Sequence, residues 1–453
     1  MSTHLLESED LLSVLTPHTG RHTALLGMVS KRIAASMARM RPPPAHEFHF
    51  DAGAERRGTE RERRDGNLAL LDRQSRRFSL TAIELPGFVL DPSGVFRQQD
   101  ARGGPRLAAV LARCPALRRL SLRGANVWRW TEIALALGAC TKLEEVDLSE
   151  TSHVNATGTN GADGTRNVAV WEGLARCPAL RELDVHGCGL RMEAESLGRM
   201  LLACTRLERL NLAGNALQED LSAEPDYEED AYHMHRLGEA LATCGRLEHL
   251  DLSRNGLDGT CVEFLENLPL CTRLASLSLA HNRFERVGAR HVARVLERTG
   301  SLRRLDMAGN PLTVNGVCNL LSGEWAQLTH LDLSECGVGA GTGSRAAQQR
   351  VADALAACET LEELELSRNA LGDAFTHVLV GALTRSAALR GLGLASVDAT
   401  EGAWGEPGSG AWLGGCAHLV RLDLTGNEWT PAGKQALRRA WTRAHGEGLL
   451  LDA

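Results

Sequence analysis

Residues 247–257 read Leu-Glu-His-Leu-Asp-Leu-Ser-Arg-Asn-Gly-Leu, and residues 207–217 read Leu-Glu-Arg-Leu-Asn-Leu-Ala-Gly-Asn-Ala-Leu. Both stretches have leucine at the first, fourth, sixth and eleventh positions and asparagine at the ninth. Leucines two residues apart are typical of a strand that buries one of its faces. The asparagine that follows is suited to a turn, because its side chain bonds backbone groups that a sheet ladder does not reach. Each stretch is therefore predicted to be a short strand followed by a turn.

The same frame recurs about twelve times along the chain. The first positions of its copies are Leu80, Leu117, Leu143, Leu180, Leu207, Leu247, Leu274, Leu302, Leu328, Leu361, Leu389 and Leu419. Between the copies lie stretches such as 192–202 and 288–297, whose apolar residues recur three and four positions apart, as in an amphipathic helix. One copy cannot bury its own leucines, but stacked copies bury them continuously. We expect an α/β solenoid with parallel strands on a concave face and helices on a convex face, curved into a horseshoe.

The frame Leu-x-x-Leu-x-Leu-x-x-Asn/Cys-x-Leu resembles that of the leucine-rich-repeat family over residues 78–445. The shortest intervals between copies are 26 to 28 residues, which resembles the ribonuclease-inhibitor-like class of these repeats. The resemblance implies a protein-binding scaffold and not an enzyme, although a fold does not name a partner. Ran GTPase-activating proteins belong to this class and use a rim arginine in catalysis. Because Arg123, Arg254 and Arg368 lie near the asparagine position, GTPase activation is a second alternative.

The residue between the second and third leucines of each copy points away from the core and onto the concave face. Eight of the twelve copies carry an acidic residue there, namely Glu84, Asp147, Asp184, Asp251, Asp306, Asp332, Glu365 and Asp423. This acidic ladder is a candidate binding face for a basic protein surface, whose encounter it would accelerate. The alternative is a local role, in which each carboxylate accepts hydrogen bonds from donors of its own strand and turn.

The intervals 143–180, 207–247 and 328–361 stretch to 37, 40 and 33 residues, and each gains its residues mainly after the asparagine position. The insertion at 218–230 holds seven acidic residues in thirteen. We expect the insertions to emerge on one rim of the solenoid, where loops that recognise a partner would not disturb the stack.

The twelve cysteines follow the repeat and not a ligand spacing. Eight of them lie three residues before the first leucine of a copy, and Cys188 and Cys336 occupy the asparagine position itself. Zinc sites typically use Cys-x-x-Cys pairs, and the chain has none. We expect buried, reduced thiols, no metal and no cofactor, in a reducing cytoplasmic or nuclear compartment.

Residues 6–40 precede the repeats and are predicted to form two short amphipathic helices joined by a turn. The paired leucines, the Val-Leu that follows them and the downstream Val-Ser-Lys-Arg resemble an F-box, although Glu7 replaces the usual proline and Ile33 the usual tryptophan. An F-box implies docking onto a Skp1-type adaptor of a cullin ubiquitin ligase, with the repeats selecting the substrate. The residues that would dock are Leu11, Leu12, Leu15 and Val29.

The alternative for residues 1–40 is a helical cap over the open edge of the first repeat. In that case the chain is a stand-alone scaffold or inhibitor that clasps a basic protein. The Pro- and Arg-rich residues 41–77 are interpreted as a linker, and residues 446–453 as a C-terminal tail.

Charge is divided unevenly, with a net of +8 over residues 1–130 and −15 over residues 131–453. The basic part lacks interleaved aromatic residues for stacking on bases, so we expect no nucleic acid partner. No apolar run approaches the roughly 20 residues of a membrane span, and the N-terminus is acidic where a signal peptide would be basic.

Overall fold

The computed structural model describes residues 46–49, 71–76, 80–85, 103–125, 130–151, 168–190, 194–218, 227–323, 327–339, 344–404, 418–444 and 448–451. The chain forms two compact units, Met1–Cys188 and Gly189–Ala453. Residues 1–40, and with them the predicted F-box-like helices, lie outside the described residues. Most of the insertion at 218–230 lies outside them as well.

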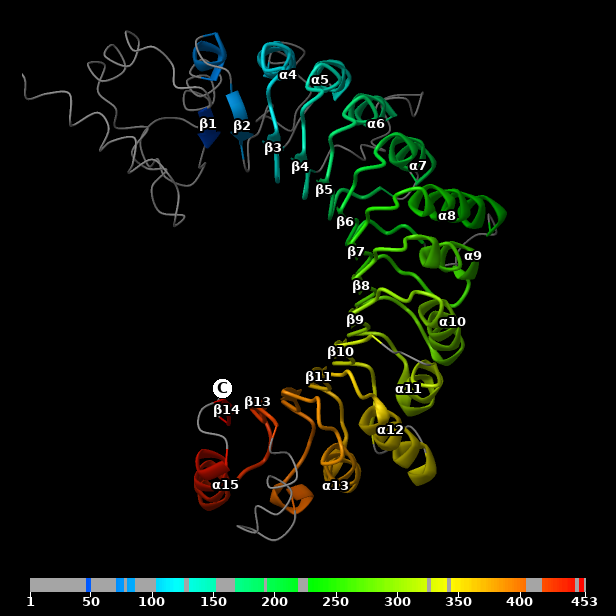
Figure 1. Cartoon of the computed structure of the whole chain (residues 1–453), viewed down its shortest axis with the longest axis vertical. Coiled ribbons are helices and arrows are strands. Elements are labelled where there is room, and N and C mark those ends of the chain that lie inside the picture. The colour runs from blue at the N-terminus through cyan, green and yellow to red at the C-terminus, as the bar shows by residue number, and fades with distance from the viewer. Residues whose placement is uncertain are drawn as a thin grey trace, which may run out of the picture. The chain divides into compact units, whose positions relative to one another are not determined.

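The N-terminal unit contains a parallel sheet with helices on one of its sides (Figure 1). Its strands are β1 (His46–His49), β2 (Leu80–Glu84), β3 (Arg119–Ser121), β4 (Glu145–Asp147) and β5 (Glu182–Asp184). Its helices are α4 (Gly103–Leu111), α5 (Trp130–Leu137) and α6 (Val168–Leu174). The central apolar residues of β2 to β5 pair in register from one strand to the next.

The C-terminal unit repeats the same arrangement along a curve, with strands on the inner side and helices on the outer side (Figure 1). Its strands are β6 (Arg209–Asn211), β7 (His249–Asp251), β8 (Ser276–Ser278), β9 (Arg304–Asp306), β10 (His330–Asp332), β11 (Glu363–Glu365), β12 (Gly391–Gly393), β13 (Arg421–Asp423) and β14 (Leu449–Leu450). Its helices are α7 (Ala194–Ala203), α8 (Tyr227–Ala242), α9 (Val262–Leu265), η2 (Leu268–Leu270), α10 (Arg286–Glu297), α11 (Thr313–Leu320), α12 (Arg345–Ala357), α13 (Gly372–Leu383), η3 (Glu401–Trp404) and α15 (Pro431–Ala444).

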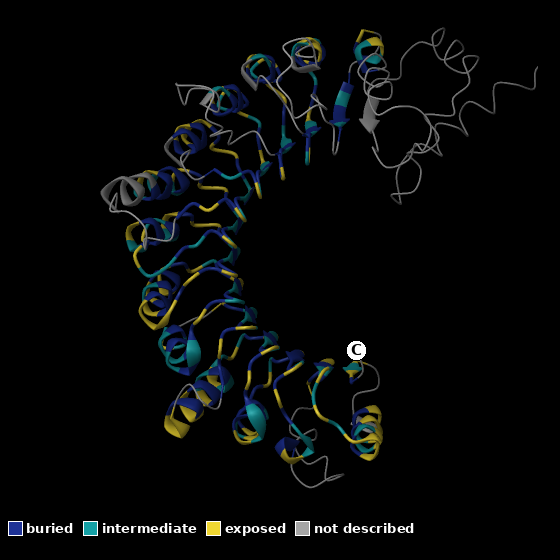
Figure 2. Cartoon of the chain, turned by 180° about the vertical axis from the view of Figure 1, so that it is seen from behind, coloured by how far each residue is buried: buried dark blue, intermediate teal, exposed yellow. Residues whose placement is uncertain are grey.

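The leucines of the frame form the core of each unit. In the copy that begins at Leu247, the leucines at 247, 250, 252 and 257 are at most 2% exposed. Figure 2 shows that buried residues lie between strands and helices, whereas exposed residues gather on the outer sides of the helices. Burial of about 25 cal/mol per Å² of apolar surface makes this continuous leucine layer the main stabilising contribution.

The asparagine position joins each turn to the turn before it. The amide nitrogen of Asn255 donates to the carbonyl of Leu252 at 3.0 Å and to that of Leu212 in the preceding repeat at 2.9 Å. Its amide oxygen accepts from the backbone N–H of Asn215 at 2.9 Å. The predicted role of this asparagine in the turn is therefore confirmed, with a bond to the neighbouring repeat in addition.

Each of the twelve predicted frames contains one strand, from β2 to β13, which confirms the leucine-rich-repeat solenoid with parallel strands and helices on opposite sides. Two interpretations need correction. The strand β1 lies within residues 41–77 and pairs with β2, so this stretch is not only a linker. The strand β14 lies within residues 446–453 and pairs with β13, so these residues are not only a tail. Neither strand carries the leucine frame by which the other strands are found.

Within the described ranges, no helix combines the length and the apolar character that crossing a membrane would require.

Candidate functional site

The strands of the C-terminal unit align the predicted acidic residues into one column on the inner face. Residues at the last position of consecutive strands pair in register, so their side chains lie side by side. From β6 to β13 this column reads Asn211, Asp251, Ser278, Asp306, Asp332, Glu365, Gly393 and Asp423. Carboxylates therefore occupy three adjacent strands, β9 to β11, whose spacing is about 4.8 Å in a sheet of this kind.

Each aspartate in this column also performs a local task. The Oδ1 atoms of Asp251, Asp306 and Asp332 accept from the backbone N–H two residues later, at 2.9, 3.0 and 2.8 Å. Asn211 does the same at 3.0 Å. The aspartates therefore accept hydrogen bonds from their own turns, as the alternative interpretation predicts, and this role engages one oxygen of each carboxylate. Because asparagine performs it equally well, the negative charge is not needed for the turn.

Burial and mutual repulsion both act on these carboxylates. Burial raises the pKa of Asp306, and the nearby carboxylates of Asp332 and Asp251 raise it further. Burial likewise raises the pKa of Glu365, against the opposing effect of Arg421. The column thus holds negative charge in a setting that disfavours it, and a cation placed over the column would stabilise its ionised form.

A second column lies beside the first, and the sequence reasoning missed it. The residue before the second leucine also points away from the core, because it is two residues from the acidic position on the same strand. From β6 to β13 this column reads Arg209, His249, Ser276, Arg304, His330, Glu363, Gly391 and Arg421. It holds three arginines and two histidines among its eight residues, so arginines lie next to the acidic row on the inner face. Burial and the nearby Arg304 lower the pKa of His330. The frame that located the acidic row would have located this row as well.

Both columns are interrupted at β12, where Gly391 and Gly393 supply no side chain. The carboxylates of Glu363 and Glu365 lie over these glycines, in the space that a Cβ atom would take. From β13, Arg421 reaches across β12 to Glu365, with 3.4 Å between Nη1 and Oε1. The glycine strand therefore allows two strands that are not neighbours to form an ion pair.

In the N-terminal unit the structure places Glu84, Asp147 and Asp184 on β2, β4 and β5. The hydroxyl of Ser121 on β3 donates to Asp147 at 2.9 Å. Beyond β5, the imidazole of His186 lies 2.9 Å from Asp184 through Nδ1 and 3.3 Å from Glu150 through Nε2.

Arg123 extends this cluster, since it also contacts Glu150, at 3.1 Å. Burial lowers the pKa of His186, but Asp184 and Glu150 outweigh this effect and raise it. The sequence offers no local signal for this cluster, because its members come from three different repeats.

The arginines considered for GTPase activation differ in their surroundings. Arg123 is paired with Glu150, and Arg368 is paired with Glu335 at 2.6 Å. Arg254 and Arg368 both have a positive φ, near 58° and 56°, at the turn residue that precedes the asparagine position.

The described cysteines are free, and most are buried. Four of those before the first leucine donate to a carbonyl of the preceding repeat, as Cys271 does to Leu241 at 3.3 Å. At the asparagine position, Cys336 donates to the carbonyl of Met307 at 3.2 Å. Burial raises the pKa of Cys271 to about 12. In the described ranges no group of three or more His, Cys, Asp or Glu residues is arranged to hold a metal ion.

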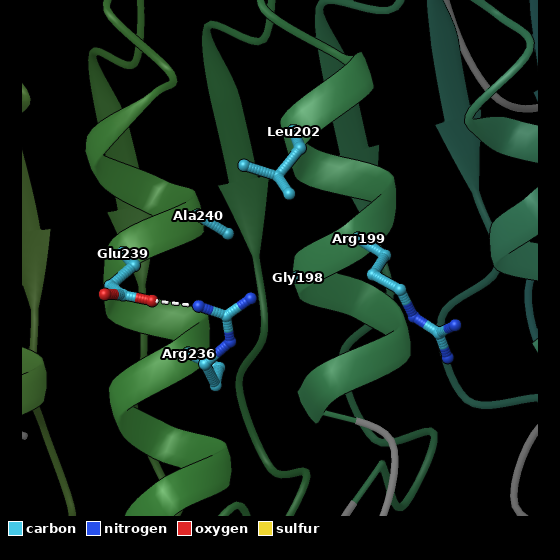
Figure 3. A pocket seen from close by; sticks show the side chains of 6 residues that line it. All are labelled: Gly198, Arg199, Leu202, Arg236, Glu239 and Ala240. Carbon is cyan, nitrogen blue, oxygen red and sulfur yellow. Dashed lines mark hydrogen bonds and ion pairs between the residues drawn. The ribbon is translucent and has the colours of Figure 1, made fainter.

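The outer side of the C-terminal unit has a shallow groove between α7 and α8 (Figure 3). Gly198 and Ala240 allow the two helices to approach, and Leu202, which is 49% exposed, points into the gap between them. Arg236 and Glu239 form an ion pair at 2.5 Å on the α8 side. The groove encloses only about 50 Å³, which is too small for a ligand of ordinary size.

Two stretches of the chain match models of the leucine-rich repeat, at residues 246–268 and 357–374. A search of curated proteins finds none that matches. Among solved structures, the chain is similar to an internalin from Listeria monocytogenes, with 16% identity, 75% of this chain and 81% of that chain covered, and a TM-score of 0.44. It is also similar to a chain of the mouse RP105/MD-1 complex, with 17% identity, 74% of this chain and 46% of that chain covered, and a TM-score of 0.42. With its leucine frame, parallel strands and buried leucine layer, the chain has the fold of a leucine-rich-repeat solenoid.

Proposed function

We propose that the protein is a non-enzymatic scaffold that binds a partner protein through the inner face of its C-terminal unit. The observation that carries this proposal is the in-register row of carboxylates Asp306, Asp332 and Glu365 on three adjacent strands. One oxygen of each aspartate serves the turn. The second oxygen of Asp306 also accepts from the hydroxyl of Ser278 at 3.1 Å, whereas that of Asp332 would face a partner. A basic row on the partner would relieve the repulsion within the column, and the adjacent row with Arg304 and His330 would fix its alignment.

The proposal is tested by variants that remove the negative charge of the column but keep the hydrogen bonds of the turns. The double variant Asp306→Asn/Asp332→Asn retains the turn acceptors, because Asn211 already fills that role in β6. The probe is a fluorescein-labelled arginine-rich peptide, and binding is followed by fluorescence anisotropy. We expect the double variant to bind about tenfold more weakly than the parent, which corresponds to about 1.4 kcal/mol.

The matched control is Glu297→Gln/Glu359→Gln, which removes two exposed charges, one at the end of α10 and one in the turn after α12. It should reduce the affinity only slightly, since exposed charges act through a screened field. Equal losses in the two double variants would show that the peptide senses only net charge, and the inner face would then not be the site.

A finer proposal concerns the assembly in which the scaffold works. We propose that the chain is the substrate-recognition subunit of a cullin-type ubiquitin ligase, with repeats of the ribonuclease-inhibitor-like class selecting the substrate. The support is the F-box-like pattern of Leu11, Leu12, Leu15 and Val29. Co-expression of the full chain with a Skp1-type adaptor should yield a stable complex, and Leu11→Ala/Leu12→Ala should abolish it with little change in the melting temperature.

If those leucines instead cap the first repeat, no adaptor is captured and the double variant melts at a lower temperature. Apolar anchors dominate such interfaces, so an adaptor complex that survives the double substitution would contradict the docking role.

A further inference from the structure

The helix α10 presents a row of arginines on its outer side. Residues 286–298 read Arg-Val-Gly-Ala-Arg-His-Val-Ala-Arg-Val-Leu-Glu-Arg, with arginine at every fourth position from 286 to 298. Residues four apart lie one above the other on the same face of a helix. The opposite face is buried against the core through residues such as Val292 and Leu296. Arg286, Arg290 and Arg294 are exposed.

These arginines differ from other exposed arginines of the same unit. Arg385 is paired with Asp353 and Arg368 with Glu335, at 2.5 and 2.6 Å. By contrast, no acidic side chain within the described ranges lies at ion-pair distance from Arg286, Arg290 or Arg294. Like charges one helical turn apart repel each other, so the row raises the free energy of the folded protein unless an anion compensates it.

The arginine row borders a groove between α10 and α11. Five of the groove residues come from α10 and one from α11, and the enclosed volume is about 280 Å³. The six lining residues are Arg286, Val287, Arg290, His291, Arg294 and Asn319. Asn319 ties the two helices together, since its amide donates to the carbonyl of Arg286 at 2.9 Å. Val287 is 65% exposed, so the groove holds an apolar contact among its cations.

The spacing of the row fits an extended chain. Arginines four residues apart on a helix are separated by about 6 Å along its axis. Alternate residues of an extended segment lie about 6.6 Å apart on one side of that segment. A segment with acidic residues at alternate positions would therefore place one carboxylate opposite each arginine. Glutamate suits the groove better than aspartate, because its longer aliphatic stem can pack on Val287.

We propose that this groove is a second interaction site, separate from the inner face, and that it binds an extended, glutamate-rich segment of a partner protein. Nucleic acid is a poorer fit, because the groove lacks aromatic side chains on which bases would stack.

The test uses the full chain and a fluorescein-labelled peptide in which glutamate and glycine alternate, with a glutamine–glycine peptide as the uncharged counterpart. We expect binding of the glutamate peptide only, with an affinity that falls as salt is added. The variant Arg290→Ala/Arg294→Ala should weaken binding by about tenfold or more, in line with the loss of two charge-assisted contacts. Arg290→Lys/Arg294→Lys should retain much of the affinity.

The matched control is Arg206→Ala/Arg439→Ala, which removes two exposed arginines of the same unit, one in the turn after α7 and one within α15. It should leave the affinity within about twofold of the parent, as should the inner-face variant Asp306→Asn/Asp332→Asn. Equal losses in the two arginine double variants, or no binding of the glutamate peptide by the parent, would overturn the proposal. A duplex DNA probe that binds more tightly than the peptide, and that loses affinity on Arg290→Ala/Arg294→Ala, would also overturn it, in favour of a nucleic acid site.

Discussion

The asparagine position shows how one side chain can connect two repeats. The carboxamide of Asn255 donates to carbonyls of two successive turns and accepts from a backbone N–H of the earlier one. Asn282 repeats this pattern one turn later, and its oxygen accepts from the N–H of Asn255 itself. Cys188 and Cys336 retain only the donor function, through a thiol that reaches a carbonyl of the preceding repeat.

Replacement of Asn255 by alanine should therefore destabilise the C-terminal unit. It removes the acceptor of the buried N–H of Asn215, and a buried group that stays unpaired costs about 1–3 kcal/mol. The carbonyls of Leu212 and Leu252 each lose one donor but still accept from Asn215 and Asn282. Urea unfolding followed by circular dichroism measures the change. The control Asn315→Ala lies on α11, where the side chain is half-buried, and should be nearly neutral. Equal stabilities of the two variants would contradict the connecting role of the asparagine.

The buried thiols that lie three residues before the first leucine of a frame should be unreactive while the protein is folded. Burial raises the pKa of Cys244 to about 11 and that of Cys271 to about 12, whereas the thiolate is the form that reacts with alkylating reagents. Iodoacetamide at pH 8 should modify Cys318, which is only half-buried, well before Cys271, as mapped by mass spectrometry. All of them should react rapidly in denaturant. Rapid alkylation of Cys271 in the native protein would be incompatible with its buried position.

At the scale of the element, strand and turn together determine what the inner face displays. A three-residue strand directs its central residue into the core and its two outer residues away from it, so every strand contributes one residue to each column. The turn after β5 adds an imidazole at the end of its strand, where His186 lies between Asp184 and Glu150.

The cluster around His186 should make the N-terminal unit sensitive to pH. The pKa of His186 is raised in the folded state relative to about 6.5 in the unfolded chain. Its stabilising contribution is therefore complete below pH 6.5 and is lost as the pH rises through the folded-state pKa. An NMR titration of the imidazole should give a higher pKa in the native protein than in urea. Asp184→Asn should reduce this difference while keeping the turn acceptor, and a native value at or below the value in urea would contradict the assignment.

At the scale of the whole molecule, the leucine layer is the feature on which every other element depends. Leu252 is fully buried in the C-terminal unit, whereas Leu270 in η2 is 56% exposed. Leu252→Ala should cost about 2–5 kcal/mol because it leaves a cavity. Leu252→Asp should cost more because it buries a charge. Thermal and urea unfolding measure the stability of both variants, and the control is Leu270→Ala, whose stability should differ little from that of the parent. Equal losses of stability in Leu252→Ala and Leu270→Ala would show that the frame does not define the core.

The sequence predicts the strands well because their leucines recur at fixed positions that only a stacked repeat can bury. The strands β1 and β14 were missed because His46–His49 and Leu449–Leu450 lack this frame and form only by pairing with a neighbouring strand. The acidic column was located by register alone. Its local role, with Oδ1 of Asp251 bound to a turn N–H, required the geometry of the turn.

The arginine row beside the groove between α10 and α11 shows a second feature that the sequence alone does not reveal. The spacing of arginines at every fourth position of α10 is visible in the sequence. The sequence does not show that Arg286, Arg290 and Arg294 form no ion pair with a described residue. Arg385 has an equally ordinary sequence context, and its ion pair with Asp353 depends on how α12 and α13 pack side by side. Charge pairing between helices is decided by the stack, so the unpaired row becomes evident only in three dimensions.

The bare strand β12 implies that an uncharged residue can control how far a carboxylate extends. Glu363 and Glu365 lie flat because Gly391 and Gly393 leave room beside them. A methyl group at Gly393 would push the Glu365 side chain upward, away from Arg421, and would project its negative charge toward an approaching molecule. A change from glycine to alanine alters no formal charge, but it would change the electrostatic potential of the inner face. Evolution could therefore alter the choice of partner at this face without the gain or loss of an ionisable group.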